Sequence, residues 1–327
     1  MRVTRMREVN LNLFDFDYDL TWMGFFVSPR EKVYGRYGGR DAGPADGRVS
    51  MAGLCCALEA ALKRHKAEPR AGNPSVAPRP SRTVAEYPAF RRLPANACVH
   101  CHQVYDLRRE SLQAAGKWSL DEVWVYPQPE NIGLTLDVDR GDHVTAVAPD
   151  SPAARAGVRA GDRIALVNGV PVSSIADLQY GLHRAGPARS LEIVRQRDGK
   201  EETTTLELPA DWRKTDVSWR WSLRGLDPMP PVRGDDLSAA EKVSLGLSPK
   251  RLAFRQGPFV TPAAEAAGIH QNDVVIGVDG KELEMNERQF GAYVRLSYKV
   301  GDRLTLNLLR GGRRVDVAVV LAGRASS

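Results

Sequence analysis

The chain has 327 residues, 43% of them hydrophobic and 26% charged, and its formal net charge is +6. This length predicts two or three domains, and this composition excludes a largely disordered chain. Basic residues are mixed with acidic ones except in short clusters such as 310–314, and no apolar run is long enough to cross a bilayer. We therefore expect neither a nucleic-acid partner nor a transmembrane segment.

Residues 1–66 predict a small α/β piece. The runs 20–27 and 32–38 are rich in β-forming residues and are separated by a short Pro-containing turn, which indicates a hairpin, and 2–10 is expected to add a strand. Ser50 is a plausible N-cap for a helix that ends near Lys66. The opening residues lack the apolar core of a signal peptide. The start is therefore expected to be a truncation or late start of an exported protein.

The next segment, 67–97, holds six prolines and little periodic apolar content, which is typical of an extended linker. It is followed by Cys98, Cys101 and His102, the C-x-x-C-H pattern. Two thiols on one turn with an imidazole directly after them suit covalent c-type haem, with His102 on the iron. A redox thiol pair or disulfide and a metal or inert site remain open as alternatives.

The haem-attachment segment is predicted to cover 98–126. Its second iron ligand is not assigned by the sequence, and water or an open site is an equal possibility. The side-chain candidates are Met229, Met285, His65 and His143.

An internal repeat occupies the rest of the chain: 151–172 matches 261–283. Both copies have a Pro-Ala-Ala helix start, a glycine-ended turn, an Asp before a β-branched strand, and an Asn-Gly or Asp-Gly turn. Each copy resembles the centre of a bacterial-type PDZ domain. The resemblance implies one PDZ domain over 127–210 and another over 237–323, joined by a connection over 211–236.

The PDZ resemblance implies that each domain binds an extended peptide or a protein C-terminus between its second strand and a groove helix. Loop N–H groups would hold the terminal carboxylate. An alternative is that neighbouring segments block a groove, which then serves only in packing. The predicted loop residues are Ile132, Gly133 and Leu134 in the first copy and Leu245, Gly246 and Leu247 in the second.

PDZ pairs also follow the protease domain of HtrA-type serine proteases. A protease is not expected here, because the chain before the first copy is too short for a double β-barrel and no Gly-x-Ser-x-Gly elbow occurs. Whether the chain is an enzyme is left open.

The run "YDLTWMGFFVSPREKVYGRYGG" resembles the C-terminal half of a thioredoxin fold without its redox helix. Together with "CVHCHQV", "YPQPENIGL" and "DWRKTDVSWRWSL", it resembles a bacterial family of thioredoxin-like proteins with C-terminal PDZ repeats. The predicted fold class is therefore α+β and multidomain: a partial thioredoxin-like piece, the C-x-x-C-H segment and two PDZ domains.

The leading functional hypothesis is a periplasmic or otherwise extracytoplasmic haem c protein. Its PDZ pair would recruit a protein partner, and its haem would serve electron transfer or redox sensing, with a possible redox partner. The alternatives are a thiol-disulfide oxidoreductase and a PDZ scaffold without redox chemistry.

Overall fold

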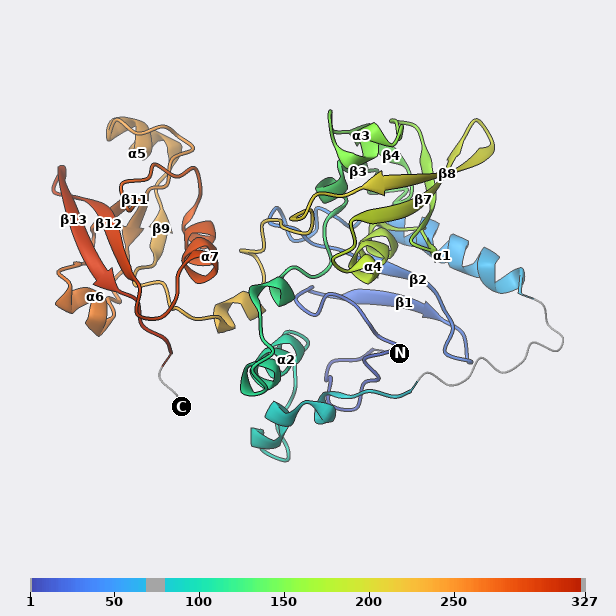
Figure 1. Cartoon of the computed structure of the whole chain (residues 1–327), viewed down its shortest axis with the longest axis horizontal. Helices are drawn as coiled ribbons and strands as arrows, with labels where there is room; N and C mark the ends of the chain where they lie inside the picture. The colour runs from blue at the N-terminus through green and yellow to red at the C-terminus, as the bar shows by residue number, and fades with distance from the viewer. Residues whose placement is uncertain (1, 69–79, 325–327) are drawn as a thin grey trace. The chain divides into compact units, whose positions relative to one another are not determined.

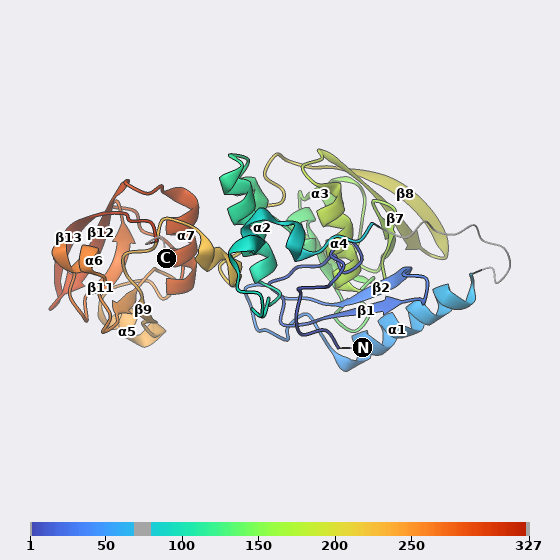
Figure 2. The ribbon, with the colours of Figure 1, turned by 90° about the horizontal axis from the view of Figure 1, so that it is seen from below.

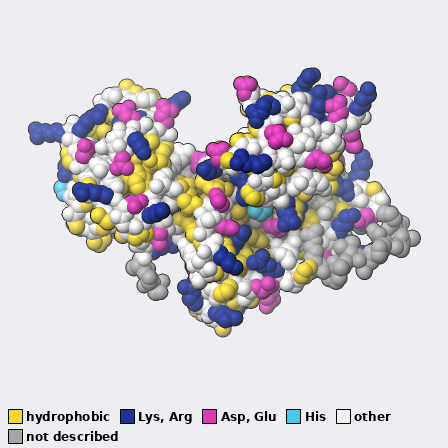
Figure 3. Space-filling model, in the orientation of Figure 1, with side chains coloured by type: hydrophobic (Ala, Val, Ile, Leu, Met, Phe, Trp, Pro, Cys, Tyr) yellow, Lys and Arg dark blue, Asp and Glu magenta, His cyan; other side chains and the backbone are white. Residues whose placement is uncertain are grey.

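The computed structural model describes residues 2–68 and 80–324, which form two compact units, Met1–Thr215 and Asp216–Ser327. Each unit contains one copy of the repeat built as a PDZ domain, termed PDZ1 and PDZ2 below. Within the described residues, no helix has both the length and the hydropathy needed to cross a membrane. On the face shown in Figure 3, Lys and Arg side chains are interspersed with Asp and Glu.

The first unit begins with an antiparallel hairpin, β1 (Met23–Val27) and β2 (Val33–Gly38), followed by helix α1 (Met51–Lys66). Ser50 is confirmed as the N-cap of α1, since its side chain accepts a hydrogen bond from the Gly53 N–H. The third strand predicted over 2–10 does not form. Backbone N–H groups there bond to distant loops instead: Met6 to Val99 and Leu11 to Arg82.

The segment predicted as an extended linker is folded where the structure describes it. Residues 80–97 contain the 3-10 turns η1 (Val84–Glu86) and η2 (Pro88–Arg92), and Val84 is fully buried. The rest of the predicted linker includes 69–79, which lie outside the described residues. Helix α2 (Gln103–Ala114) and the 3-10 turn η3 (Leu120–Val123) follow, and lead into PDZ1.

PDZ1 combines a β3–β4 pair with a four-stranded sheet in the order β6-β5-β7-β8, and its helix α4 packs over the core. Ile132, Leu178 and Ile193 are fully buried in that core. Its elements are η4 (Pro129–Ile132), β3 (Leu134–Leu136), β4 (Val144–Val147), α3 (Pro152–Arg155), β5 (Arg163–Val167), β6 (Val170–Pro171), α4 (Ile175–Ala185), β7 (Ser190–Arg197) and β8 (Lys200–Glu207).

PDZ2 has a five-stranded antiparallel sheet in the order β13-β12-β11-β10-β9, so β9 is an edge strand. Its core is centred on Phe254, Phe290 and Leu306, all fully buried. Its elements are η5 (Ser222–Gly225), β9 (Gly234–Asp236), α5 (Ala239–Ser244), β10 (Phe254–Gln256), α6 (Pro262–Ala266), β11 (Val274–Val278), α7 (Glu287–Ser297), β12 (Arg303–Arg310) and β13 (Arg313–Val320).

A buried aspartate before the β-branched strand has the same role in both copies. Asp162 accepts hydrogen bonds from the Arg197 guanidinium at 2.6 and 2.8 Å in PDZ1. Asp273 accepts them from Arg310 at 2.8 and 2.7 Å in PDZ2. The repeated sequence thus produces the same bidentate ion pair twice, which ties the end of one strand to the hairpin beside it.

Candidate peptide-binding grooves

The PDZ1 loop lies where the sequence places it. Gly133 has φ +88°, and a Cβ there would stand 2.1 Å from the Ser151 side chain, so only glycine fits. Ile132 and Leu134 are fully buried beside it. The Gly133 N–H donates to the Glu130 carbonyl within the 3-10 turn. This donor is therefore already occupied, although it was predicted to hold a peptide carboxylate.

The walls of the PDZ1 groove, η4–β3 and α4, are bound by the N-terminal segment of the same chain. On the loop side, Arg48 forms an ion pair with Glu130 at 2.7 Å, and Ser50 bonds to Asp139 at 2.6 Å. On the helix side, a Cβ on Gly39 would stand 3.8 Å from the Oε1 atom of Gln179. The segment between β2 and α1 thus contacts the loop side of the groove and passes close to its helix side.

Strand β2 packs against α4, and the two elements lie side by side in Figures 1 and 2. The Arg36 N–H donates to Asp177 at 2.9 Å, and the Ser174 hydroxyl donates to the Arg36 carbonyl at 2.6 Å. The Arg36 guanidinium stacks on the Tyr180 ring at 3.5 Å. The groove helix of PDZ1 is therefore enclosed by its own chain.

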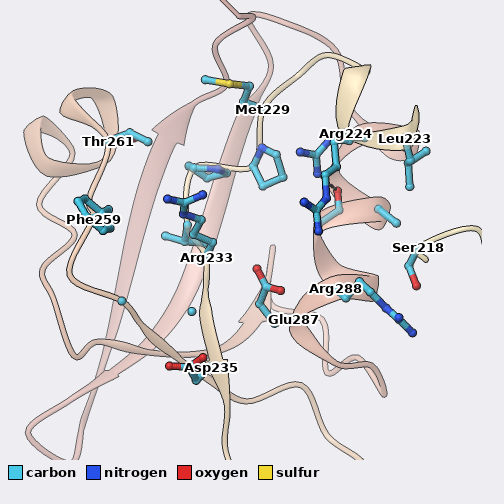
Figure 4. Close-up of a pocket in the computed structure, with 18 of the residues that line it drawn as sticks. Ser218, Leu223, Arg224, Met229, Arg233, Asp235, Phe259, Thr261, Glu287 and Arg288 are labelled. Carbon is cyan, nitrogen blue, oxygen red and sulfur yellow. Dashed lines mark hydrogen bonds between the residues drawn. The ribbon is translucent and has the colours of Figure 1, made fainter. Parts of the chain in front are cut away.

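PDZ2 differs, because an open cavity of about 840 Å³ lies between β9 and α7 (Figure 4). Gly234 and Asp235 form its strand side, and Gly291 and Ala292 form its helix side. Phe259, with 75% of its surface exposed, lies at its margin. The cavity has the position and size of a ligand groove whose strand wall is the free edge of the sheet.

The loop predicted for PDZ2 lies elsewhere. Leu245, Gly246 and Leu247 follow the C-terminal end of α5, and Leu247 is buried with Leu237 in a separate apolar cluster. The cavity is instead bordered by 229–233, which precede β9. This segment falls within 211–236, which the sequence predicts as the connection between the domains, so nothing in the sequence indicated that it borders a groove.

The C-x-x-C-H residues lie at the start of α2. Cys98 is exposed and Cys101 is half-buried, both are free thiols, and burial raises the pKa of Cys101. The Nδ1 atom of His102 is 3.8 Å from Asp106. The described residues contain no group of three His, Cys, Asp or Glu side chains arranged for a metal ion.

The four residues predicted as candidate second iron ligands make other contacts in the structure. His65 Nδ1 is 3.0 Å from the Tyr34 hydroxyl, and His143 Nδ1 is 2.7 Å from Asp142. Met285 packs against the PDZ2 core, and Met229 lines the PDZ2 cavity.

Comparison with known proteins identifies both copies of the repeat as PDZ domains. Family models described as PDZ domain match 143–197 and 258–321. This result confirms a multidomain chain with two PDZ domains of mixed α/β content.

The curated proteins similar to this chain include periplasmic serine endoproteases. The chain is 33% identical over 146 residues to the periplasmic pH-dependent serine endoprotease DegQ of Escherichia coli, covering 45% of this chain and 30% of DegQ. It is 44% identical over 153 residues to the periplasmic serine endoprotease DegP of Salmonella typhimurium, covering 46% of this chain and 29% of DegP. The chain thus spans about a third of the length of these relatives.

Among solved structures, the HtrA3 PDZ domain bound to a phage-derived ligand shares 30% identity with a TM-score of 0.18, covering 22% of this chain and 65% of that one. A serine endoprotease from Yersinia pestis shares 29% identity with a TM-score of 0.21, covering 23% of this chain and 27% of that one.

These relatives overturn several predictions. The resemblance to thioredoxin-like haem proteins is wrong, because the similar proteins are serine endoproteases and no thioredoxin-like piece is supported. Haem c, electron transfer, redox sensing and a redox partner have no support in them either. The predicted extracytoplasmic location is confirmed, since these relatives are periplasmic. PDZ domains bind extended peptides and protein C-termini, so the two family matches support a peptide as the class of partner.

Proposed function

We propose that this chain is a peptide-binding protein whose working groove is the one in PDZ2. An extended peptide segment adds to the free edge of β9 and is covered by α7. PDZ1 serves as a packing domain that holds the N-terminal segment. One observation carries the proposal: among the described residues no strand pairs with the β9 edge along one wall of the PDZ2 cavity, whereas both walls of the PDZ1 groove contact residues of the N-terminal segment.

The groove has the parts that strand addition needs. Among the described residues β9 pairs with β10 alone, so its other edge is open to strand addition, and there the Gly234 N–H is hydrogen-bonded to the Glu287 carboxyl group. Helix α7 is fixed opposite this edge, because the Glu287 N–H donates to Asp236 at 2.8 Å. Leu223, Val232 and Phe259 supply apolar surface for side chains of the peptide. Backbone hydrogen bonds would give affinity, and these contacts would give selectivity.

The proposal is tested by fluorescence anisotropy of labelled peptides titrated with the full chain. A peptide that binds should lose affinity when alternate backbone nitrogens on its paired edge are methylated, because methylation removes the donors of the ladder. Mass analysis of the recovered peptide separates binding from cleavage. An intact peptide supports recruitment, and cleavage would show that the chain acts as a protease, as its relatives are named.

A matched pair of variants locates the site. Gly291 lies on the cavity side of α7, where a Cβ would be 3.3 Å from Nη1 of Arg295 and 3.8 Å from Pro230. Gly291→Leu should fill the gap and weaken binding at least tenfold, or about 1.4 kcal/mol. Ser297→Leu changes an exposed position on the same helix, outside the cavity lining, and should bind like the wild type. Equal affinity of both variants and the wild type would exclude the PDZ2 groove.

A further inference from the structure

The PDZ2 cavity carries an excess of positive charge. Six arginines line it against two acids, Asp235 and Glu287, so the excess is six minus two, or four charges. In Figure 4, Arg224, Arg233 and Glu287 lie around the same space. The arginines are Arg220, Arg224, Arg233, Arg288, Arg295 and Arg324.

Three of these arginines have no carboxylate partner within salt-bridge distance in the described part of the chain. Arg224 stacks on the Trp221 ring at 4.1 Å, and Arg295 donates to the Gly291 carbonyl at 2.9 Å. The buried Nε atom of Arg295 has no hydrogen-bond partner among the residues that the structure describes. Arg324, from the segment after β13, completes the group. Three elements distant in sequence thus direct guanidinium groups to one cavity.

The pKa of Arg295 indicates that Arg224, Arg295 and Arg324 lie close enough to repel one another. Burial and, to a smaller extent, the positive charges of Arg324 and Arg224 together lower the pKa of Arg295 to about 10. Such a shift means that the cationic form of Arg295 is poorly compensated in the protein alone. A bound anion would relieve both the burial and the repulsion.

The backbone at the expected carboxylate position is poor in donors. Pro230 and Pro231 have no N–H group. The Met229 N–H donates to the Ala322 carbonyl, and the Arg233 N–H donates to the Gln256 side chain. Of the five residues before β9, only Val232 has a backbone N–H that donates no hydrogen bond to another described residue. Backbone amides therefore cannot form the anion cradle that PDZ loops normally supply.

We propose that the PDZ2 groove selects peptides that carry a carboxylate group, which is bound by the guanidinium groups of Arg224, Arg295 and Arg324 in place of backbone N–H groups. The proposal rests on the peptide-binding function of this groove. The carboxylate has two possible sources, the C-terminus of the peptide or an Asp or Glu side chain. Arginine suits this role, because its planar fork binds a carboxylate through two hydrogen bonds.

The test uses the full chain and four labelled peptides of one sequence: with Glu or with Gln before an apolar C-terminal residue, each as a free acid or an amide. Loss of one charge-assisted hydrogen bond corresponds to a loss of affinity of about tenfold. Amidation should cause this loss if the C-terminus is the bound group, and Glu-to-Gln exchange should cause it if the side chain is. Higher ionic strength should weaken only the peptide that carries the recognised carboxylate.

Arg224→Gln and Arg324→Gln change exposed residues and should each weaken the preferred peptide about tenfold while changing the neutral peptide little. Arg314→Gln is the matched control, because Arg314 is an exposed arginine on β13 outside the cavity. The carboxylate proposal is overturned if all four peptides bind with equal affinity. It is also overturned if Arg224→Gln and Arg324→Gln weaken binding of the neutral peptide as much as binding of the charged ones. In either case the proposal that PDZ2 binds peptides still stands. Absence of binding by every peptide would overturn the proposed function itself.

Discussion

Replacement of Asp273 by asparagine should destabilise PDZ2 selectively. The Asp273 side chain is 2% exposed and accepts two hydrogen bonds from Arg310 and one from the His270 N–H, at 2.7 to 2.8 Å. Asparagine has nearly the same shape but places an NH₂ donor where one oxygen faced a donor. The loss of one charge-assisted hydrogen bond costs about 2 kcal/mol. With a urea m-value of about 1–2 kcal/mol/M, the unfolding midpoint falls by about 1–2 M.

The assay must measure the stability of each PDZ domain separately, because the two domains lie in different compact units of the chain. Hydrogen exchange measured at increasing urea reports the opening of β11 and β12 for PDZ2, and of β5 and β7 for PDZ1. Asp162→Asn is the reciprocal variant, since Asp162 accepts the Arg197 guanidinium in PDZ1 as Asp273 accepts Arg310 in PDZ2. Each variant should weaken its own domain. An equal effect on both domains, or a midpoint unchanged within about 0.3 M, would refute the local assignment.

The same ion pair predicts a pH dependence. Burial alone would raise the pKa of Asp273, but hydrogen bonds from Arg310 and the His270 N–H lower it below its usual value. Because the folded-state pKa is lower than the unfolded one, the stabilisation is present above the unfolded pKa of about 4. It is lost as the pH falls through the folded value. Asp273→Asn should therefore reduce the acid sensitivity of PDZ2, and an unchanged pH profile would contradict this reasoning.

Two further predictions concern PDZ1 and the loop glycines. Asp177→Asn should weaken the hydrogen bond from the Arg36 N–H and so increase hydrogen exchange in β2. It should also let PDZ1 bind peptides that the wild type binds only in PDZ2. Unchanged exchange in β2 would count against this prediction. Gly133→Ala should destabilise PDZ1 by more than about 2 kcal/mol, because its Cβ would meet Ser151 at 2.1 Å, whereas Gly246→Ala, which has open space, should cost about 1 kcal/mol in thermal unfolding. Equal costs would show that steric contact does not decide these positions.

The repeat, its turns and the groove helices could be predicted from the sequence because they depend on local chemistry. Ser151 and Thr261 cap α3 and α6 by accepting from the N–H three residues later. Asn168 and Asp279 adopt the positive φ that their turns require. These features follow from the residues themselves and from neighbours in the chain.

The PDZ2 loop could not be predicted in this way. Gly133 and Gly246 both have positive φ and both stand between apolar residues, so their local signals are alike. Gly246, however, ends α5, which the chain inserts after the edge strand, and the strand itself is only three residues long. Contacts with α7, distant in sequence, decide which segment borders the groove. A blocked groove was an alternative from the sequence, but the segment that covers PDZ1 could not be identified for the same reason, since a hydrogen bond such as Arg36 to Asp177 spans 141 residues.

The arginine-lined cavity also affects how copies of this chain meet. A free strand edge beside an exposed Phe259 is a template on which a second copy could pair and begin to aggregate. Two such edges approaching each other would bring two clusters with an excess of four positive charges into contact. Their repulsion opposes self-pairing, while a peptide carrying negative charge is attracted to the same edge. The charge that we propose selects the ligand would therefore also oppose self-association through the open edge of the sheet.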